Sequence, residues 1–206
     1  MEAGLLMAKR FLHEMITPAV VRAEQQYYDR AYPAQNVAPP RDPLTLDEAE
    51  FIQSRDSFYM ATVTENDWPY LQHRGGPSGF LRVISPTQIG FADYGGNRQM
   101  LTTGNLSAND RVTLFLMDYP HRERLKIMGH AKVLDAREHP DLVEKLTPVG
   151  GHPAKPERIF LIEVISFDWN CPKFITPRYT TEEVQAVVEP LQKRIAELEA
   201  QLQAKK

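Results

Sequence analysis

The sequence predicts a mainly β protein, an antiparallel barrel of six strands with helices at both ends. The middle of the chain holds short runs that are apolar or that alternate apolar with polar residues, separated by turn signals at hairpin-like spacing. No long alternation of strands and helices accompanies them, which argues against a doubly wound parallel sheet. The terminal segments have apolar residues at helical spacing instead. The six runs span residues 57–67, 68–76, 80–94, 111–119, 124–135 and 158–170.

The N-terminal segment is expected to be helical. Its apolar residues recur at roughly helical spacing between residues 4 and 31, which indicates one or two amphipathic helices. Thr17-Pro18 marks the break or restart between them, because proline is well tolerated in the first turn of a helix. Residues 32–44 are rich in proline and poor in apolar side chains, so we expect a linker or a strap along the surface.

Three short helices are expected around the strands. Thr45, with Glu48 three residues later, has the pattern of a capping box that opens the first. The other two are expected at residues 97–106 and 138–146. Asn97 follows two glycines and is the expected N-cap of the helix that begins there.

The C-terminal tail is predicted to be an amphipathic helix with an apolar heptad seam. Pro190 lies inside it and is expected to kink or restart the helix. A seam this short is marginal alone, so it needs a partner, either a second copy of itself or the N-terminal helices. We therefore expect three parts, at residues 1–44, 45–178 and 179–206. The seam residues are Val184, Val188, Leu191, Ile195, Leu198 and Leu202.

Composition narrows the class of protein. The chain has 206 residues, of which 42% are hydrophobic and 25% charged, as in ordinary globular proteins. A net charge of −3 gives no general electrostatic case for binding nucleic acid or an anionic membrane. One cysteine, Cys171, excludes an intramolecular disulfide framework and fits a reducing cytoplasm. We expect no signal peptide, since charges interrupt the first apolar run, and no run reaches the ~20 apolar residues of a membrane span.

A candidate anion site lies in the stretch FADYGGNRQM, residues 91–100. An apolar strand is followed by a glycine pair, then by amides on either side of Arg98 and the expected start of a helix. A helix N-terminus together with an arginine is a natural site for an anion. The alternative is a plain capped turn with Arg98 in solvent, and the stretch alone leaves both interpretations open.

The order of these segments resembles the pyridoxamine 5′-phosphate oxidase-like, FMN-binding split barrels. The resemblance covers roughly residues 45–178, and the later stretch FDWNCPKFITPRY resembles the ending of a poorly characterised branch of that family. It implies a six-stranded antiparallel split β-barrel that forms a homodimer, with FMN in a groove at the dimer interface. The segments that carry it are WPYLQHRGG, FADYGGNRQ, NLSANDRVTLFLMDY and RLKIMGHAKVL.

The resemblance assigns the FMN phosphate to the end of the third run, at residues 80–94, and the stretch after it. Family members have Phe-Thr-Asn-Tyr and then Ser-Arg-Lys, where this chain has Asp93 and Tyr94 and then Asn97, Arg98 and Gln99. Arg98 corresponds to the phosphate-binding arginine, since a planar guanidinium can bind two phosphate oxygens at once. The two neighbouring amides can donate hydrogen bonds but add no charge.

Two further strands are implied to reach the flavin. One runs under the edge of the isoalloxazine ring, and a cation there would stabilise the anionic reduced form of the cofactor. Without the family, these side chains would be interpreted as ordinary outward residues of a strand. The implied residues are Gln72, His73, Arg74 and Gly75 on the earlier strand, and Arg124 and Lys126 on the later one.

Asn170 and Cys171 follow the last apolar run and complete the candidate cofactor site. Cys171 is either a thiol near the flavin whose pKa is lowered by Lys173, or a small buried apolar residue. Asn170 either hydrogen-bonds the pyrimidine edge of the flavin or caps a turn. Both pairs of alternatives remain open from the sequence.

The expected function is that of an FMN-dependent oxidoreductase with an unknown small-molecule substrate. Authentic pyridoxamine phosphate oxidases bind the substrate phosphate with a lysine, near which this chain has Pro77, and with a later Tyr–Arg–Ser series that has no counterpart here. Oxidation of vitamin B6 is therefore not expected. Two alternatives are a non-enzymatic flavin-binding or flavin-sensing dimer, and a barrel that binds another flat cofactor such as a deazaflavin or haem. The histidines show no metal-ligand spacing, so no metal site is expected, and no catalytic residue is assigned.

Overall fold

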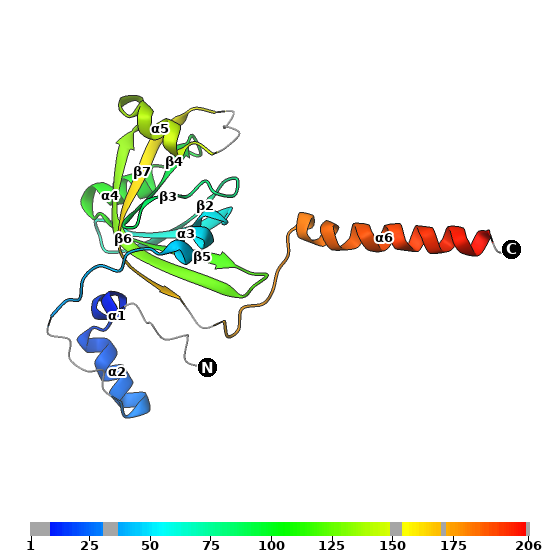
Figure 1. Cartoon of the computed structure of the whole chain (residues 1–206). Coiled ribbons are helices and arrows are strands. Elements are labelled where there is room, and N and C mark those ends of the chain that lie inside the picture. The colour runs from blue at the N-terminus through cyan, green and yellow to red at the C-terminus, as the bar shows by residue number, and fades with distance from the viewer. Residues whose placement is uncertain (1–8, 31–36, 149–153, 170–171, 205–206) are drawn as a thin grey trace. The chain divides into compact units, whose positions relative to one another are not determined.

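The computed structural model describes residues 9–30, 37–148, 154–169 and 172–204. They divide into two compact units, one within residues 1–117 and 124–171, the other within residues 118–123 and 172–206. The first unit contains most of the sheet, and the second contains the C-terminal helix (Figure 1).

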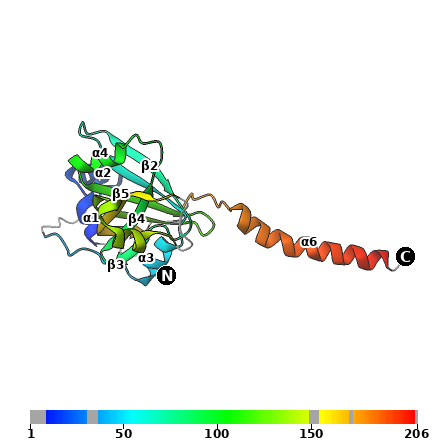
Figure 2. The same ribbon diagram turned by 90° about the horizontal axis from the view of Figure 1, so that it is seen from above.

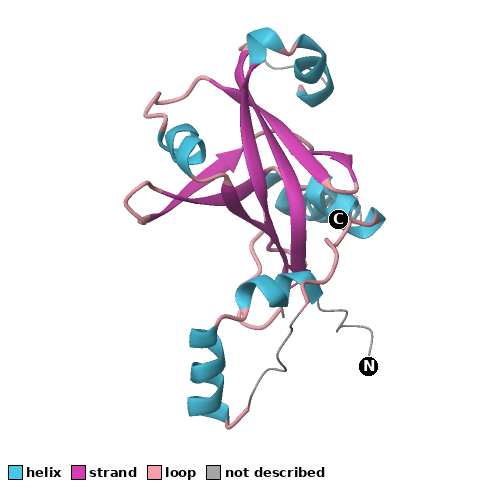
Figure 3. Ribbon diagram, turned by 90° about the vertical axis from the view of Figure 1, so that its left-hand side faces the viewer, coloured by secondary structure: helices cyan, strands magenta, loops and turns pink. Residues whose placement is uncertain are grey.

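The sheet has seven strands in the order β2-β1-β5-β6-β7-β4-β3. The described ladders are all antiparallel: they pair β1 with β2 and β5, β3 with β4, and β7 with β4 and β6. The predicted mainly β, antiparallel class is confirmed. The strand number is seven and not six, because the run at residues 80–94 reverses direction at the turn Pro86-Thr87 and forms two strands. Figure 3 shows the strands in magenta. They are β1 (Ser57–Val63), β2 (Pro69–Gly75), β3 (Arg82–Ser85), β4 (Gln88–Tyr94), β5 (Arg111–Asp118), β6 (Glu123–Asp135) and β7 (Pro156–Trp169).

The sheet curls until strands from opposite ends of its order face each other (Figure 2). Phe58 of β1 packs against Phe91 of β4, with ring centroids 5.5 Å apart, although three strands separate β1 from β4 in the sheet order. Phe91 in turn stacks on Phe160 of β7 at 4.8 Å. All three rings are almost completely buried, so this aromatic cluster forms the middle of the barrel core.

The helices agree largely with the sequence. Thr17 is the N-cap of α2, and Thr45 and Glu48 form the predicted capping box at the start of α3. The C-terminal helix runs through Pro190 as one continuous element, without the expected restart. No described helix is both long and apolar enough to cross a membrane. The helices are α1 (Lys9–Met15), α2 (Pro18–Tyr28), α3 (Leu46–Gln53), α4 (Leu101–Ala108), α5 (Pro140–Leu146) and α6 (Thr181–Gln203), with a 3₁₀ turn at Ala136–Glu138.

The helix expected at residue 97 begins later, and Asn97 is not its N-cap. The side-chain oxygen of Asn97 accepts a hydrogen bond from the backbone N–H of Gln99, which closes a local turn. Arg98 then has a φ of 58° and Met100 a φ of 59°, and these left-handed residues cannot belong to a right-handed helix. α4 therefore starts at Leu101, with Met100 as its N-cap.

Residues 37–44 form a strap along the first unit. The backbone N–H of Asp42 donates to the carbonyl of Ile165 at 3.2 Å, and that of Leu44 donates to the carbonyl of Pro86 at 2.7 Å. Arg41 forms an ion pair with Glu163 of β7. The sequence left a linker and a surface strap as alternatives, and residues 37–44 form the strap.

Candidate functional site

β2 presents alternate side chains to the inside of the barrel. Tyr70, Gln72 and Arg74 are half-buried, while the residues between them are exposed, as the two-residue period of a strand requires. β4 ends opposite them with Asp93 and Tyr94, which lie at the same end of the barrel as the loop that follows.

These side chains line a pocket of about 220 Å³ between β2, the end of β4 and the start of α4. The wall is mostly polar, and its charged members are three arginines and one aspartate. The lining residues are Tyr70, Gln72, Arg74, Asp93, Tyr94, Gly96, Asn97, Arg98, Gln99, Met100, Leu101, Thr102, Thr103 and Arg158.

Asp93 lies between two arginines at the base of this pocket. Its Oδ1 is 2.7 Å from Nη1 of Arg74, and its Oδ2 is 2.8 Å from Nη2 and 2.9 Å from Nε of Arg158. All three side chains are largely buried. Burial lowers the pKa of the Arg74 guanidinium, and the charge of Asp93 opposes that shift. Nη1 of Arg158 also lies 3.1 Å from Oε2 of Glu157, just outside the pocket. Two carboxylates therefore face three guanidiniums, and the pocket keeps an excess of one positive charge.

Arg98 supplies the third charge from a strained loop. Its side chain is 80% exposed, and its Nη2 lies 3.7 Å from Oε1 of Glu157, a loose contact that holds the guanidinium weakly. A left-handed φ is unfavourable for a residue with a β-carbon, and such strain is concentrated at functional sites. A β-carbon on Gly96 would meet nothing within 4 Å, so the loop has open space at this position.

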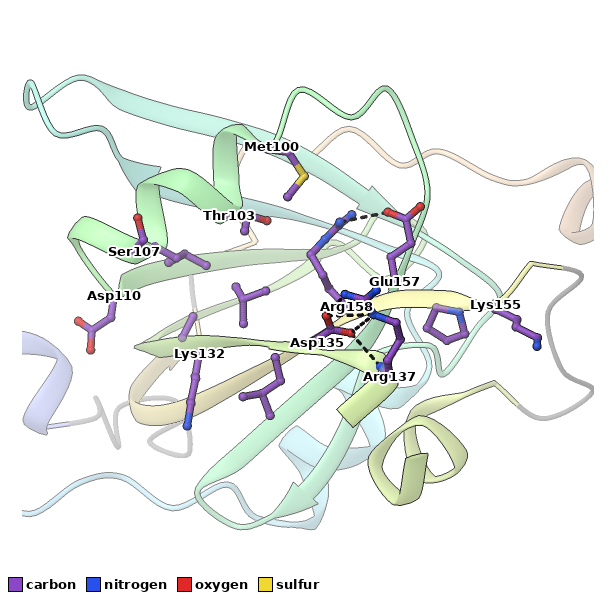
Figure 4. A pocket seen from close by; sticks show the side chains of 15 residues that line it. Met100, Thr103, Ser107, Asp110, Lys132, Asp135, Arg137, Lys155, Glu157 and Arg158 are labelled. Carbon is purple, nitrogen blue, oxygen red and sulfur yellow. Dashed lines mark hydrogen bonds and ion pairs between the residues drawn. The ribbon is translucent and has the colours of Figure 1, made fainter. Parts of the chain in front are cut away.

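A larger pocket of about 1,000 Å³ adjoins the first and shares Met100, Thr103 and Arg158 with it. Figure 4 shows α4 along one side of this pocket, with Met100, Thr103 and Ser107, and the paired side chains of Asp135 and Arg137 on another. Apolar side chains of α4 and β6 cover part of its wall, namely Leu106, Ala131, Val133 and Leu134.

A family model described as pyridoxamine 5′-phosphate oxidase matches residues 44–165, which is more than half of the chain. The chain belongs to this family. A search of curated proteins gave no match. The matched range contains the whole barrel up to the middle of β7, and therefore every wall of the two adjoining pockets.

Solved structures that resemble this member of the family include HupZ of Group A Streptococcus, which is 13% identical, with a TM-score of 0.49 over 61% of this chain and 98% of that one. An FMN-binding protein from Syntrophomonas wolfei is 12% identical, with a TM-score of 0.46 over 61% and 87% of the two chains. An F420 reductase is 15% identical, with a TM-score of 0.41 over 58% and 94%.

Seven of the residues predicted from the family resemblance line the small pocket together. They come from β2, the end of β4 and the following loop, which are far apart in sequence. The seven are Gln72, Arg74, Asp93, Tyr94, Asn97, Arg98 and Gln99.

His73 and Gly75 lie beside this group on the other face of β2. The ring of His73 packs edge-on against the ring of Tyr59, with centroids 5.6 Å apart. Both residues line a third pocket of about 260 Å³ at the end of the strand, which also contains Arg74 and Asp93. Their separation from Gln72 follows from the alternation of side chains along a strand.

Arg124 and Lys126 line neither of the two adjoining pockets. Nζ of Lys126 lies 3.0 Å from Oδ2 of Asp168 and 4.8 Å from the ring centroid of Phe11 on α1. The larger pocket is lined by the other end of β6, from Ala131 onward, about 20 Å along the strand. Asn170 and Cys171 lie outside the described residues.

Sequence reasoning missed Arg158 and two threonines of α4. The hydroxyl of Thr102 donates to the side-chain oxygen of Gln72, so it orients that amide within the pocket. Thr103 lines both pockets. One signal could have found Arg158, since this charge immediately precedes the apolar run of residues 159–162 in β7. Within the described ranges, no group of three or more histidine, cysteine or acidic residues could hold a metal ion.

Proposed function

We propose that this protein binds FMN and acts as an FMN-dependent oxidoreductase on a small molecule other than a vitamin B6 phosphate. One observation carries the proposal: Arg74, Arg98 and Arg158 converge on a small pocket with a single carboxylate, beside a pocket large enough for a ring system. Phosphate would occupy the first pocket, and the flat rings the second.

The small pocket fits a phosphate in charge and in hydrogen bonding. Planar guanidiniums bind two phosphate oxygens at once, and the three of them exceed the combined charge of Asp93 and Glu157 by one. Nε of Arg74 is buried and has no hydrogen-bond partner among the described residues, so the existing contacts of this side chain leave one of its donors unsatisfied. The hydroxyl of Thr103 and the amide of Gln99 add uncharged donors to the wall.

The larger pocket fits the rest of the molecule. The small pocket is below the roughly 300–1,000 Å³ of sites that enclose a whole cofactor-sized ligand, whereas its neighbour reaches that size. Leu106, Val133 and Leu134 give it an apolar surface for a flat aromatic system. Arg158, which borders both pockets, would put a positive charge between phosphate and rings.

Bound FMN would supply the hydride and electron transfer, and the chain would supply binding, orientation and charge. The residues that would hold the phosphate are Arg74, Arg98 and Arg158. A homodimer with the cofactor groove at its interface is part of this proposal. In such a dimer, Arg124 and Lys126 would act on the flavin of the second protomer, which accounts for their distance from the pockets of their own chain.

The first experiment compares FMN with riboflavin, which has the same rings and lacks the phosphate. We expect the purified protein to show flavin absorption, heat to release FMN identified by mass spectrometry, and FMN to bind far more tightly than riboflavin. Arg158→Ala should weaken FMN binding about 10- to 100-fold, the value of a charge-assisted hydrogen bond, and leave riboflavin binding nearly unchanged. Arg22→Ala, at an exposed position of α2, is the matched control.

Three results would overturn parts of the proposal. Equal affinity for FMN and riboflavin would show that the small pocket does not bind the phosphate. If the protein binds neither flavin but retains a deazaflavin or haem, the cofactor is not FMN, and the alternative cofactor class is supported. A flavin that NADH and NADPH both fail to reduce, with no other reductant found, would favour a flavin-sensing dimer over an enzyme.

A further inference from the structure

α6 exposes a continuous apolar stripe. The side chains of its predicted seam alternate at intervals of four and three residues along the helix. Every one of them is exposed, from 37% for Val188 to 65% for Leu202, and no residue of α6 is buried. A stripe of large apolar side chains along a soluble helix marks a surface that another helix covers.

The residue types on this stripe fit one kind of coiled coil. In heptad notation, the a positions are Val188, Ile195 and Leu202, and the d positions are Val184, Leu191 and Leu198. Two of the three a positions are β-branched, and two of the three d positions are leucine. β-branched residues at a with leucine at d favour two parallel strands over trimers and tetramers.

The charges beside the stripe fit the same arrangement. The g positions are Val187, Arg194 and Gln201, and the e positions are Gln185, Gln192 and Glu199. In a parallel pair, each g residue faces the e residue five positions later on the other helix, so Arg194 faces Glu199 of the partner subunit, twice by symmetry. In an antiparallel pair g meets g and e meets e. Neither set contains both signs of charge, so no opposite-charge pair can form there.

The remainder of the helix is compatible with this pairing. Thr180 and Glu183 form a capping box that fixes the N-terminal end of α6. Pro190 occupies a c position, which points away from the seam, so the hydrogen bond that it removes lies on the solvent side. α6 has 23 residues, about three heptads, and a helix of this kind is marginal unless its apolar side is covered.

We infer that α6 forms a parallel two-stranded coiled coil with α6 of a second copy of this chain. The inference stands on α6 alone and does not depend on the proposed cofactor. It gives the second unit a defined partner, and it aligns the C-terminal ends of the two protomers side by side.

Disulfide trapping in the full-length protein tests the pairing and its direction. All variants carry Cys171→Ser, so that the introduced thiol is the only one. Leu202→Cys should form a disulfide-linked dimer under mild oxidation, because equivalent a positions meet in a parallel pair. A mixture of Val184→Cys and Leu202→Cys protein should give no mixed dimer. Failure of Leu202→Cys to cross-link, or efficient mixed cross-linking, would overturn the inference.

A charge exchange tests the register. Adding Arg194→Glu to the Leu202→Cys protein places two acids opposite each other, so the cross-linking rate should fall severalfold. Adding Glu199→Arg as well should restore it. The matched control is Lys193→Glu at an f position, which makes a comparable charge change on the outer face and should leave the rate unaltered. A double exchange that fails to restore cross-linking would refute the Arg194–Glu199 contact and with it the parallel register.

Discussion

Nη1 of Arg74 lies 2.7 Å from Oδ1 of Asp93, and this ion pair joins the edge strand β2 to β4 near the opposite edge of the sheet. Asp93 also binds Arg158 of β7, so a single buried carboxylate links three strands beside the candidate site. The same contacts leave the pocket with more positive than negative charge. The stability of the fold and the proposed binding of a phosphate therefore depend on the same cluster of side chains.

Asp93→Asn should destabilise the protein strongly. It would leave Arg74 buried without a counter-charge and Arg158 with only Glu157 as its partner. Removing one partner of a buried ion pair typically costs about 3–5 kcal/mol of unfolding free energy, measured by chemical denaturation. Inorganic phosphate should recover more stability in this variant than in the natural protein, because an anion could replace the missing carboxylate. Asp135→Asn is the control and should have a far smaller effect, because its partner Arg137 is exposed and an asparagine can still accept the hydrogen bond from the backbone N–H of Arg137.

Arg98→Gly should make the protein more stable and bind FMN less tightly. Glycine adopts a φ of 58° without strain, so the free energy of unfolding should rise by about 1 kcal/mol. The lost guanidinium should lower FMN affinity about tenfold or more. Arg98→Ala retains the strain and should lose the same affinity without the gain in thermal stability. If the glycine and alanine variants are equally stable, the left-handed backbone at residue 98 is not strained.

Glu48 should make stability depend on pH in the acidic range. Burial alone would raise the pKa of this carboxyl, but hydrogen bonds from Thr45 and from the indole of Trp169 outweigh burial and lower it below its usual 4.5. A lowered pKa in the folded state adds stability that is present above 4.5 and is lost as the pH falls further. Glu48→Gln should therefore cost most stability near neutral pH.

The measurement is thermal unfolding of both proteins across the acidic range. The difference between them should shrink progressively below pH 4.5. Glu50→Gln, at an exposed position of the same helix, should show no such dependence. A difference that widens on acidification would mean that the carboxylate is not the stabilising form.

Gly129→Ala should destabilise the sheet by about 1–3 kcal/mol. The β6–β7 register shifts between Met128 and Gly129, and there a β-carbon would collide with the backbone carbonyl of Glu163. A backbone atom cannot move aside as a flexible side chain can. The control is Gly104→Ala in α4, where a β-carbon would meet nothing within 4 Å, and there alanine should be neutral or stabilising. If both substitutions lower the free energy of unfolding by similar amounts, the close approach of Gly129 to the backbone of Glu163 is not the cause.

The strands could be predicted because burial on one face of a sheet imposes a two-residue period on the sequence. Phe58, Met60 and Thr62 show this in β1. The run at residues 80–94 was counted as one strand, because apolar residues continue on both sides of Pro86 and only the tight turn separates them. The capping box at Thr45 was found because its two side chains interact locally.

The candidate site was harder to predict where it depends on the pairing of strands that are distant in sequence. Arg158 lies directly opposite Asp93 in the β4–β7 ladder, a contact between residues 65 apart that no local pattern encodes. Asn97 was assigned to a helix N-cap because an Asx turn and an N-cap use the same side-chain hydrogen bond. The left-handed geometry of Arg98 carries no sequence signal, since arginine has no preference for it.

The strand order sets the order in which the barrel can assemble. β1 with β2 and β3 with β4 are hairpins of neighbouring segments, whereas the ladder of β4 with β7 joins residues such as Phe91 and Phe160. Long-range pairing of this kind must wait for the chain entropy of a large loop to be overcome, and it slows folding. The hairpins should therefore form early and the β4–β7 seam late. Any state in which that seam is still open presents β4 as an unpaired apolar edge, and such an edge favours aggregation.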